Sequence, residues 1–233
     1  MKEKVIGILG GMGPEASCEI FRRIIKNTQA KTDADHIRVI MDSNTKIPDR
    51  TRAILNGGIS PVDEMIKTAK NLQNAGADFI IIPCMTAHFF IDIVQKAIDI
   101  PIINALSETN KYINEGYPTL TEIGLLATSG TIATGLFQNF LINKKVITPE
   151  EKIQENLVMN TIYGVNGIKA GNTSPEIIET LAGVVDELKE KGAKGIISGC
   201  TEISLVMNPK LIDIPLIDPL TVLARRAIEI ARA

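Results

Sequence analysis

Two cysteines, Cys84 and Cys200, stand in matching local sequences and are the side chains of this chain best suited to chemistry. Residues 83–86 read Pro-Cys-Met-Thr and residues 199–202 read Gly-Cys-Thr-Glu, each close behind a run of isoleucines. A free thiol titrates near pH ~8.5, so two thiols can share one proton at neutral pH after modest tuning. One thiolate can then remove a proton from carbon while the opposite thiol returns one on the other face. The pair therefore predicts inversion of a carbon centre.

Two further residues could assist these thiols. His88 follows Cys84 by four residues and Glu202 follows Cys200 by two, so either could orient a thiol or change its proton affinity. Each also has an ordinary explanation. A helical histidine often bonds to backbone, and an acid in a first helical turn is favoured by the helix dipole. The third cysteine, Cys18, lies among apolar residues at helical spacing, and we predict that it belongs to the core.

Basic side chains and backbone N–H groups are available to hold a substrate anion. Arg50 lies in the loop 47–52, and arginine binds carboxylates with two parallel hydrogen bonds. Lys169 lies in a glycine-flanked turn that could direct its ammonium group into a cleft. Single basic residues in loops are more often solvated, so this alternative stays open. The turns 10–13 and 128–130 offer backbone N–H groups to an anion.

The residues that could position these groups form a plan that occurs twice. Short apolar strands alternate with amphipathic helices, which is typical of parallel βαβ units. We expect strands at 5–9, 37–41 and 79–82, and helices at 14–27, 61–75, 87–97 and 220–232. Four landmarks then recur in the same order and at nearly constant spacing: 7–13 with 124–130, 76–77 with 192–193, 80–86 with 196–202, and 99–101 with 213–215.

The repeat predicts an α/β fold of two pseudo-symmetric three-layer α/β/α domains with mainly parallel sheets. We place the domains at 1–116 and 117–233, and we expect the C-terminal helix to pack back on the first half. Each cysteine follows the carboxyl end of an equivalent strand, the edge at which open parallel sheets bind ligands. The two thiols are therefore expected to face one active site in the cleft between the domains.

Composition excludes several classes of function. The 233 residues carry a net charge of −2 without a basic stripe, so we expect no nucleic-acid partner. No apolar stretch approaches the ~20 residues that span a bilayer, and the N-terminus lacks a signal peptide, so we expect no membrane partner and a cytoplasmic location. With two histidines and no paired ligand spacing, we expect no metal site.

With these residues identified, the sequence resembles the aspartate/glutamate racemase family, and within it the aspartate racemase branch. The matching segments are 7–17, 48–51, 83–88 and 199–202. The resemblance implies a homodimer that racemises an amino acid without pyridoxal phosphate, metal or nucleotide, with Cys84 and Cys200 as the acid/base pair. It places Arg50 and Lys169 at the substrate carboxylates. Further positions that line the site are then Met12, Asn44, Met85, Thr86, Thr128 and Thr201.

One residue departs from the family pattern. The first cysteine motif of the family usually reads Pro-Cys-Asn-Thr, and here Met85 takes the place of the asparagine. A methionine cannot supply the polar contacts of an amide, so this change leaves the two thiols intact but bears on the choice of substrate. Aspartate is the first expectation, with glutamate or a broader range behind it. Related chemistry also remains open: hydantoin racemases use two thiols, whereas maleate isomerases and arylmalonate decarboxylases depend on one.

Two alternatives lie outside this family. Residues 11–16 satisfy the pattern G-x-G-x-x-A behind a strand, which would suit a nucleotide-dependent enzyme. However, Asp42 lies farther along the chain than the ~20 residues usual for a ribose-binding acid. The other alternative is a protein that binds acidic amino acids without catalysis, which would tolerate loss of either cysteine.

Overall fold

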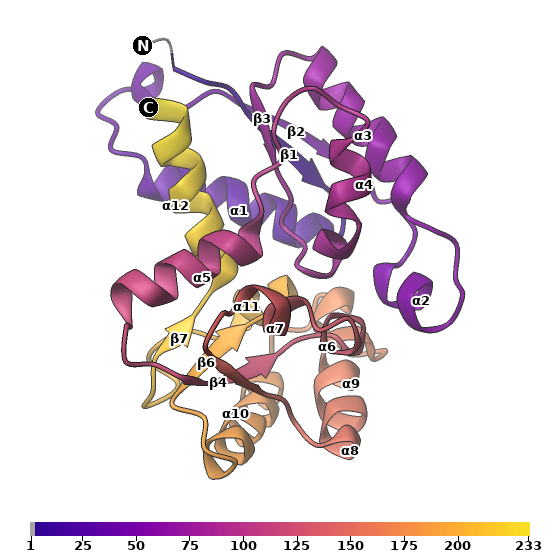
Figure 1. Cartoon of the computed structure of the whole chain (residues 1–233), viewed down its shortest axis with the longest axis vertical. Helices are drawn as coiled ribbons and strands as arrows, with labels where there is room; N and C mark the ends of the chain where they lie inside the picture. Colours follow the sequence, from indigo (N-terminus) through magenta and orange to yellow (C-terminus); the bar gives the residue numbers. More distant parts are fainter. Residues whose placement is uncertain (1–2) are drawn as a thin grey trace.

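The computed structural model describes residues 3–233, which form two α/β/α domains with parallel sheets, and this confirms the predicted fold class (Figure 1). The strands of the first sheet run in the order β2-β1-β3 and are β1 (Ile6–Gly10), β2 (Val39–Ser43) and β3 (Phe79–Ile81). The second sheet has the order β5-β4-β6-β7, with β4 (Glu122–Leu126), β5 (Lys145–Ile147), β6 (Gly195–Ser198) and β7 (Leu216–Ile217).

The repeat in the sequence corresponds to the same order and pairing of strands in the two sheets. In the first sheet β1 pairs with β2 and β3, and in the second β4 pairs in parallel with β5 and β6. In the first sheet a single parallel bridge between Ile80 and Ile102 takes the place that the pairing of β6 with β7 has in the second sheet. The repeated glycines have a packing reason, since a Cβ atom at Gly7 would lie 2.9 Å from the Cβ of Ala77. At Gly124 the same contact, to Ala193, would be 3.2 Å.

The helices that cover the sheets follow the predicted plan with local shifts. Their bounds are α1 (Pro14–Asn27), α2 (Arg50–Leu55), α3 (Val62–Asn74), α4 (Ile91–Gln95), α5 (Ala105–Gly116), α6 (Ser129–Ala133), α7 (Leu136–Phe140), α8 (Glu151–Ile153), α9 (Asn160–Tyr163), α10 (Pro175–Glu190), α11 (Thr201–Val206) and α12 (Pro219–Arg232). Short 3₁₀ turns lie at η1 (Asp33–Asp35), η2 (Thr86–Phe90) and η4 (Ile168–Ala170), and a π-helical segment at η3 (Gln154–Met159).

Three expectations about these elements need adjustment. The second strand lies two residues later than predicted, at Val39–Ser43. The helix expected at 87–97 is a 3₁₀ turn followed by α4, because the backbone N–H groups of Ala87 and His88 bond three residues back, to Cys84 and Met85. The prediction that Cys18 is a core residue is wrong.

Cys18 is exposed because of its position around α1. The buried residues of this helix are Ala16, Ser17, Ile20 and Ile24. At 100° per residue Cys18 lies about 200° around the helix from Ile20, and therefore on its outer side. The apolar spacing identified the helix correctly but not which of its residues face inward.

At the junction, each half of the chain supplies a helix that packs against the other half. After β7 the chain enters α12, which packs against α1 and α5, and the backbone N–H of Lys4 donates to the carbonyl of Ala231 at 2.9 Å. The equivalent helix α5 leaves the first sheet and packs against α7 of the second domain. The chain then passes into β4 through residues 117–121, near the predicted boundary.

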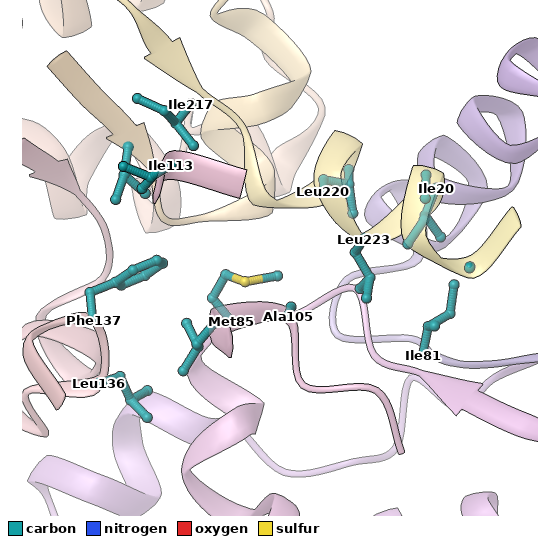
Figure 2. Packing of buried hydrophobic residues seen from close by; sticks show 14 of the residues in the cluster. Ile20, Ile81, Met85, Ala105, Ile113, Leu136, Phe137, Ile217, Leu220 and Leu223 are labelled. Atoms are coloured by element: carbon teal, nitrogen blue, oxygen red, sulfur yellow. The ribbon is translucent and has the colours of Figure 1, made fainter. Parts of the chain in front are cut away.

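One apolar cluster fills this junction and draws on both sheets. Figure 2 shows Met85 between Leu136 and Phe137 from α7 on one side and Ala105 on the other. Only 2 % of Met85 is exposed. Its thioether therefore belongs to the packing that joins the domains. Throughout residues 3–233, no helix combines the length and the apolar character that crossing a bilayer requires.

Candidate active site

Cys84 and Cys200 line one pocket between the two domains. Both are buried, with 6 % of each residue exposed. The rest of the lining comes from both halves of the chain: Met12, Arg50, Met85, Thr86, Thr128, Tyr163, Lys169, Thr201 and Glu202. The free volume of the pocket is about 10 Å³, which is roughly the space of one water molecule. The structure therefore presents the cleft in a closed form.

The strand ends deliver the two thiols to this pocket. Cys84 follows β3, and its backbone N–H bonds to the carbonyl of Ile82 at 2.8 Å in a tight turn. Cys200 follows β6 and is the N-cap residue of α11. A Cβ atom at Gly199 would lie 2.6 Å from Leu125, so only glycine lets the strand end pack this closely before the cysteine.

Arg50 supplies a buried positive charge beside Cys84. It is the first residue of α2, whose N-cap Asp49 accepts a hydrogen bond from the backbone of Arg52 at 2.8 Å. The guanidinium donates to the carbonyls of Pro48 (3.0 Å) and Met12 (3.4 Å), while its Nε has no partner among residues 3–233. Burial lowers the pKa of Arg50, but negative charge at Cys84 and Asp49 outweighs this and raises it. The cation stabilises negative charge on Cys84.

Cys200 has the opposite environment. Its Sγ donates to Oε2 of Glu202 at 3.0 Å, and the other carboxylate oxygen forms an ion pair with Lys169. Burial, followed by the charge of Glu202, raises the pKa of Cys200 well above its ordinary value, although Lys169 opposes this. Burial also raises the pKa of Glu202, yet Lys169 and the bond from Cys200 bring it below the ordinary value. Glu202 is therefore ionised and Cys200 retains its proton.

This asymmetry comes from one repeated position. Glu202 stands two residues after Cys200, and Thr86 stands two residues after Cys84. The Thr86 hydroxyl bonds across the domain boundary to Thr128 at 3.1 Å and to Thr131 at 2.9 Å. The first half-site thus holds neutral hydroxyls where the second holds a carboxylate. As a result only Cys200 has a carboxylate beside its sulfur.

Sequence reasoning missed Tyr163, which lines the pocket from the end of α9. Its hydroxyl donates to Oδ2 of Asp49 at 3.1 Å, which joins the two domains, and its ring lies 5.3 Å from Nζ of Lys169. Burial, and then the charge of Asp49, raises the pKa of Tyr163, so the hydroxyl stays protonated and able to donate. No motif marks this tyrosine, and it has no counterpart in the repeat that would have drawn attention to it.

Asn44 does not reach the pocket lining, contrary to the expectation from the resemblance. Its amide nitrogen donates to Oγ1 of Thr68 at 2.9 Å and to Glu64 at 3.3 Å, both on α3. Its amide oxygen accepts the backbone N–H of Lys46 at 3.0 Å. With these bonds the amide stabilises the loop that follows β2 and does not face the pocket.

His88 also lies outside the pocket and has the ordinary role. Its Nδ1 bonds to the carbonyl of Cys84 at 3.0 Å, and its Nε2 accepts the backbone N–H of Ala105 at 3.1 Å. Burial lowers the pKa of His88 to about 4, so the ring is neutral at pH 7. It holds the Cys84 turn against the start of α5 and does not face a substrate.

The backbone donors predicted in the two turns are partly occupied. The N–H of Gly11 donates to Oγ of Ser17 at 2.9 Å, and the N–H of Ser129 donates to the sulfur of Met159 at 3.3 Å. Gly13 brings the first turn close to the opposite wall, where a Cβ atom would lie 3.4 Å from Glu202. The charged side chains are therefore the main anion-binding groups of the closed pocket.

Comparison with known proteins agrees with this geometry. The profile of the Asp/Glu/hydantoin racemase family matches residues 9–227. The broad specificity amino-acid racemase RacX of Bacillus subtilis is 26% identical over 241 residues, covering 96% of each protein. Picrophilus torridus aspartate racemase is 26% identical with a TM-score of 0.85, covering 98% of this chain and 94% of that one.

A putative Asp/Glu racemase from Yersinia pestis is 25% identical with a TM-score of 0.80, covering 99% of this chain and 100% of the other. A glutamate racemase from Francisella tularensis, solved with D-glutamate, shares the fold at a TM-score of 0.69 and 21% identity. Matched over nearly its full length, the chain belongs to the Asp/Glu/hydantoin racemase family, and the type of reaction that this membership assigns to it is an isomerisation.

Proposed function

We propose that this protein interconverts L- and D-aspartate without a cofactor, using Cys84 and Cys200 as the two acid/base groups. The observation that carries the proposal is the shared pocket, in which one thiol faces the Arg50 guanidinium and the other donates to the Glu202 carboxylate. Removing a proton from one face of a carbon and adding one to the other face requires a base and an acid on opposite sides of the substrate. The charges around the two sulfurs suit these two states.

In one direction Cys84 acts as the base. Its thiolate takes the α-proton, so the C–H bond breaks, an S–H bond forms, and the electron pair remains on carbon and spreads into the α-carboxylate. Cys200 then gives its proton to the opposite face, and its S–H bond becomes the new C–H bond. The enzyme is left with a Cys84 thiol and a Cys200 thiolate, which is the state that accepts the other enantiomer.

The cations Arg50 and Lys169 hold the carboxylates of the substrate in this mechanism. Carboxylate charge grows as the α-proton leaves, and a fixed cation in a dry pocket stabilises that charge strongly. In the closed pocket Lys169 is paired with Glu202, so a substrate carboxylate has to share this ammonium group with Glu202. The Nε–H of Arg50 has no partner within residues 3–233, so this group needs no such exchange.

A racemase of glutamate or of broader range is the second candidate. It is favoured by Met85, whose side chain packs in the junction core and so presents no amide to a substrate. It is also favoured by the full-length similarity to RacX of Bacillus subtilis, which is described as a broad specificity enzyme. In either case the two thiols have the same roles.

The test is an incubation of purified protein with L-aspartate, L-glutamate and a panel of neutral and basic amino acids in D₂O under reducing conditions. Proton NMR follows loss of the α-proton, and chiral chromatography follows the D-isomer. We expect both signals with aspartate, and no racemisation in Cys84→Ala or Cys200→Ala. Racemisation of other amino acids alone would favour the second candidate. Binding without any exchange would indicate a protein that holds acidic amino acids without catalysis.

A homodimer, which the resemblance implies, and the cytoplasmic location expected from the sequence are part of the same proposal. Light scattering tests the oligomeric state, because one chain has a mass of 25.3 kDa. A particle of about twice this mass is expected. A monomer that is fully active would overturn the dimer and leave the rest of the proposal standing.

A further inference from the structure

The turn that carries Cys200 is fastened by a group of polar side chains outside the pocket. Asp218 is the N-cap of α12, and its Oδ1 accepts from the backbone of Leu220 and from Oγ of Ser204, both at 2.9 Å. Ser204 lies one helical turn after Cys200, and its Oγ also contacts Oγ of Ser198 at 3.1 Å and the carbonyl of Cys200 at 3.5 Å. Asp218 therefore reaches the thiol turn through one hydroxyl.

A guanidinium from the other domain completes this group. Arg23 of α1 forms an ion pair with Oδ2 of Asp218 and donates to the carbonyl of Ser204 at 3.1 Å and to Oγ1 of Thr221 at 2.6 Å. Its Nε bonds to Glu19 at 2.7 Å, which fixes the plane of the guanidinium. Only 13 % of the Arg23 side chain and 20 % of the Asp218 side chain are exposed. We name Arg23, Asp218 and Ser204 the clamp.

The repeat gives the clamp a counterpart in the first domain. Ser204 follows Cys200 by four residues, as His88 follows Cys84. His88 ties the Cys84 carbonyl to the first turn of α5, and Ser204 ties the Cys200 turn to the first turn of α12. Since α5 and α12 pack against each other, both thiol turns are anchored to one helix pair (Figure 1). The second anchor alone includes an ion pair that crosses between domains.

We propose that Arg23 and Asp218 are positioning residues that hold the sulfur of Cys200 at the substrate. This inference rests on the proposed function, since it assumes that Cys200 exchanges a proton with carbon. Neither residue lines the thiol pocket, and both border a separate groove of about 550 Å³. Their effect therefore passes through Ser204 and the start of α11. Misplacing a catalytic group by about 1 Å can lower a rate about 100-fold.

The test compares Arg23→Gln with Arg22→Gln, a control on the same helix that also loses a bond to Glu19 but never touches Asp218. We expect racemisation to fall about 100-fold in Arg23→Gln and to change little in Arg22→Gln. Arg23→Lys, which keeps the charge beside Asp218, should be intermediate. Thermal melting establishes that each variant is folded under the assay conditions.

A second signal separates positioning from general loss of structure. In D₂O a displaced Cys200 leaves Cys84 able to remove the α-proton, exchange the resulting S–H for S–D with the solvent, and return that deuteron to the same face. Deuterium exchange without inversion should therefore rise relative to racemisation in Arg23→Gln for the enantiomer that Cys84 deprotonates. An unchanged ratio of exchange to racemisation would overturn the proposal.

A third signal is independent of activity. Iodoacetamide labelling, followed by peptide mass spectrometry, should show a changed rate at Cys200 and an unchanged rate at Cys84 when Arg23 is replaced. If the wild type racemises no amino acid, the proposed function fails, and this selective change would show that the clamp still positions Cys200. Equal changes at both cysteines, or no change at either, would overturn the clamp whatever the activity.

Discussion

At the residue scale, the two half-sites differ most at a single position of the repeat. Thr86 and Glu202 occupy the same place behind their cysteines, and Arg50 and Lys169 supply one cation to each. With a carboxylate on one side only, Cys200 is the thiol whose pKa is raised and which keeps its proton in the closed pocket. Under the proposed mechanism, this selects the protonation state in which Cys200 acts as the acid.

Replacing Glu202 by glutamine should remove this selection. Because the charge of Glu202 raises the pKa of Cys200, its loss lowers that pKa, and the alkaline limb of kcat/KM should move to lower pH. We expect the maximal rate to fall about 100-fold, at the lower end of acid/base contributions. Glu202→Asp, which keeps the charge, is the control. If the alkaline limb does not move in Glu202→Gln, the charge of Glu202 does not control the pKa of Cys200.

His88 should make stability depend on pH without acting in catalysis. Its pKa is about 4 in the folded protein and 6.5 in the reference state, so the unfolded chain binds more protons between these values. The free energy of unfolding is therefore highest above pH 6.5 and falls as the pH drops, by about 2 kcal/mol between pH 7 and pH 5. Urea titrations at both pH values measure this difference. A variant such as His88→Gln should lose it, and an equal dependence in that variant would assign it to other groups.

At the scale of the elements, the glycines of the central strands decide how closely the sheet packs on its helices. In Gly124→Ala the new Cβ would lie 2.7 Å from Ile196 and 3.2 Å from Leu188. Such overpacking typically costs about 1–3 kcal/mol of stability. Gly183, within α10, has nothing within 4 Å of the same atom, and Gly183→Ala should stabilise the protein by about 0.5–1 kcal/mol. Urea unfolding of both variants gives opposite signs if packing is the cause.

Most strands and helices could be predicted from the sequence, because they follow from the spacing of hydrophobic residues and from the positions of turn residues. The paired thiol turns were found because the repeat places both behind equivalent strands. Periodicity could not distinguish the 3₁₀ turn after Cys84 from an α-helix, since the two differ by one residue in hydrogen-bond spacing. It also could not orient Cys18, or direct the Asn44 amide toward Thr68, because side-chain direction depends on neighbours far along the chain.

At the scale of the whole molecule, the closed pocket predicts that its two walls move apart before a substrate reaches the thiols. A free volume of about 10 Å³ cannot admit an amino acid. The contacts that cross between the walls include the bond between Tyr163 and Asp49 and the packing of α2 on α6, where Gly130 lies directly against Thr51, so a movement of the domains is expected to break them. Tyr163 was beyond sequence reasoning because its role exists only after the domains meet.

Tyr163→Phe should therefore weaken closure while leaving both thiols intact. Losing one hydrogen bond of about 1 kcal/mol should raise KM about fivefold. Steady-state kinetics with the racemised amino acid measures this change, and Asp49→Asn, which can still bond to the hydroxyl and cap α2, should be closer to the wild type. An unchanged KM in Tyr163→Phe would mean that this bond does not hold the domains together.

The repeat within a single chain has a consequence for evolution. A site assembled from two identical chains must carry the same side chain at both equivalent places, so a change in one half-site is always a change in both. Joined in one polypeptide, the two places mutate independently, and position 86 is threonine while position 202 is glutamate. Mutation can then change the surroundings of each thiol separately. One chain with two different halves can thereby place a carboxylate beside one sulfur alone, which a symmetric pair of identical chains cannot do.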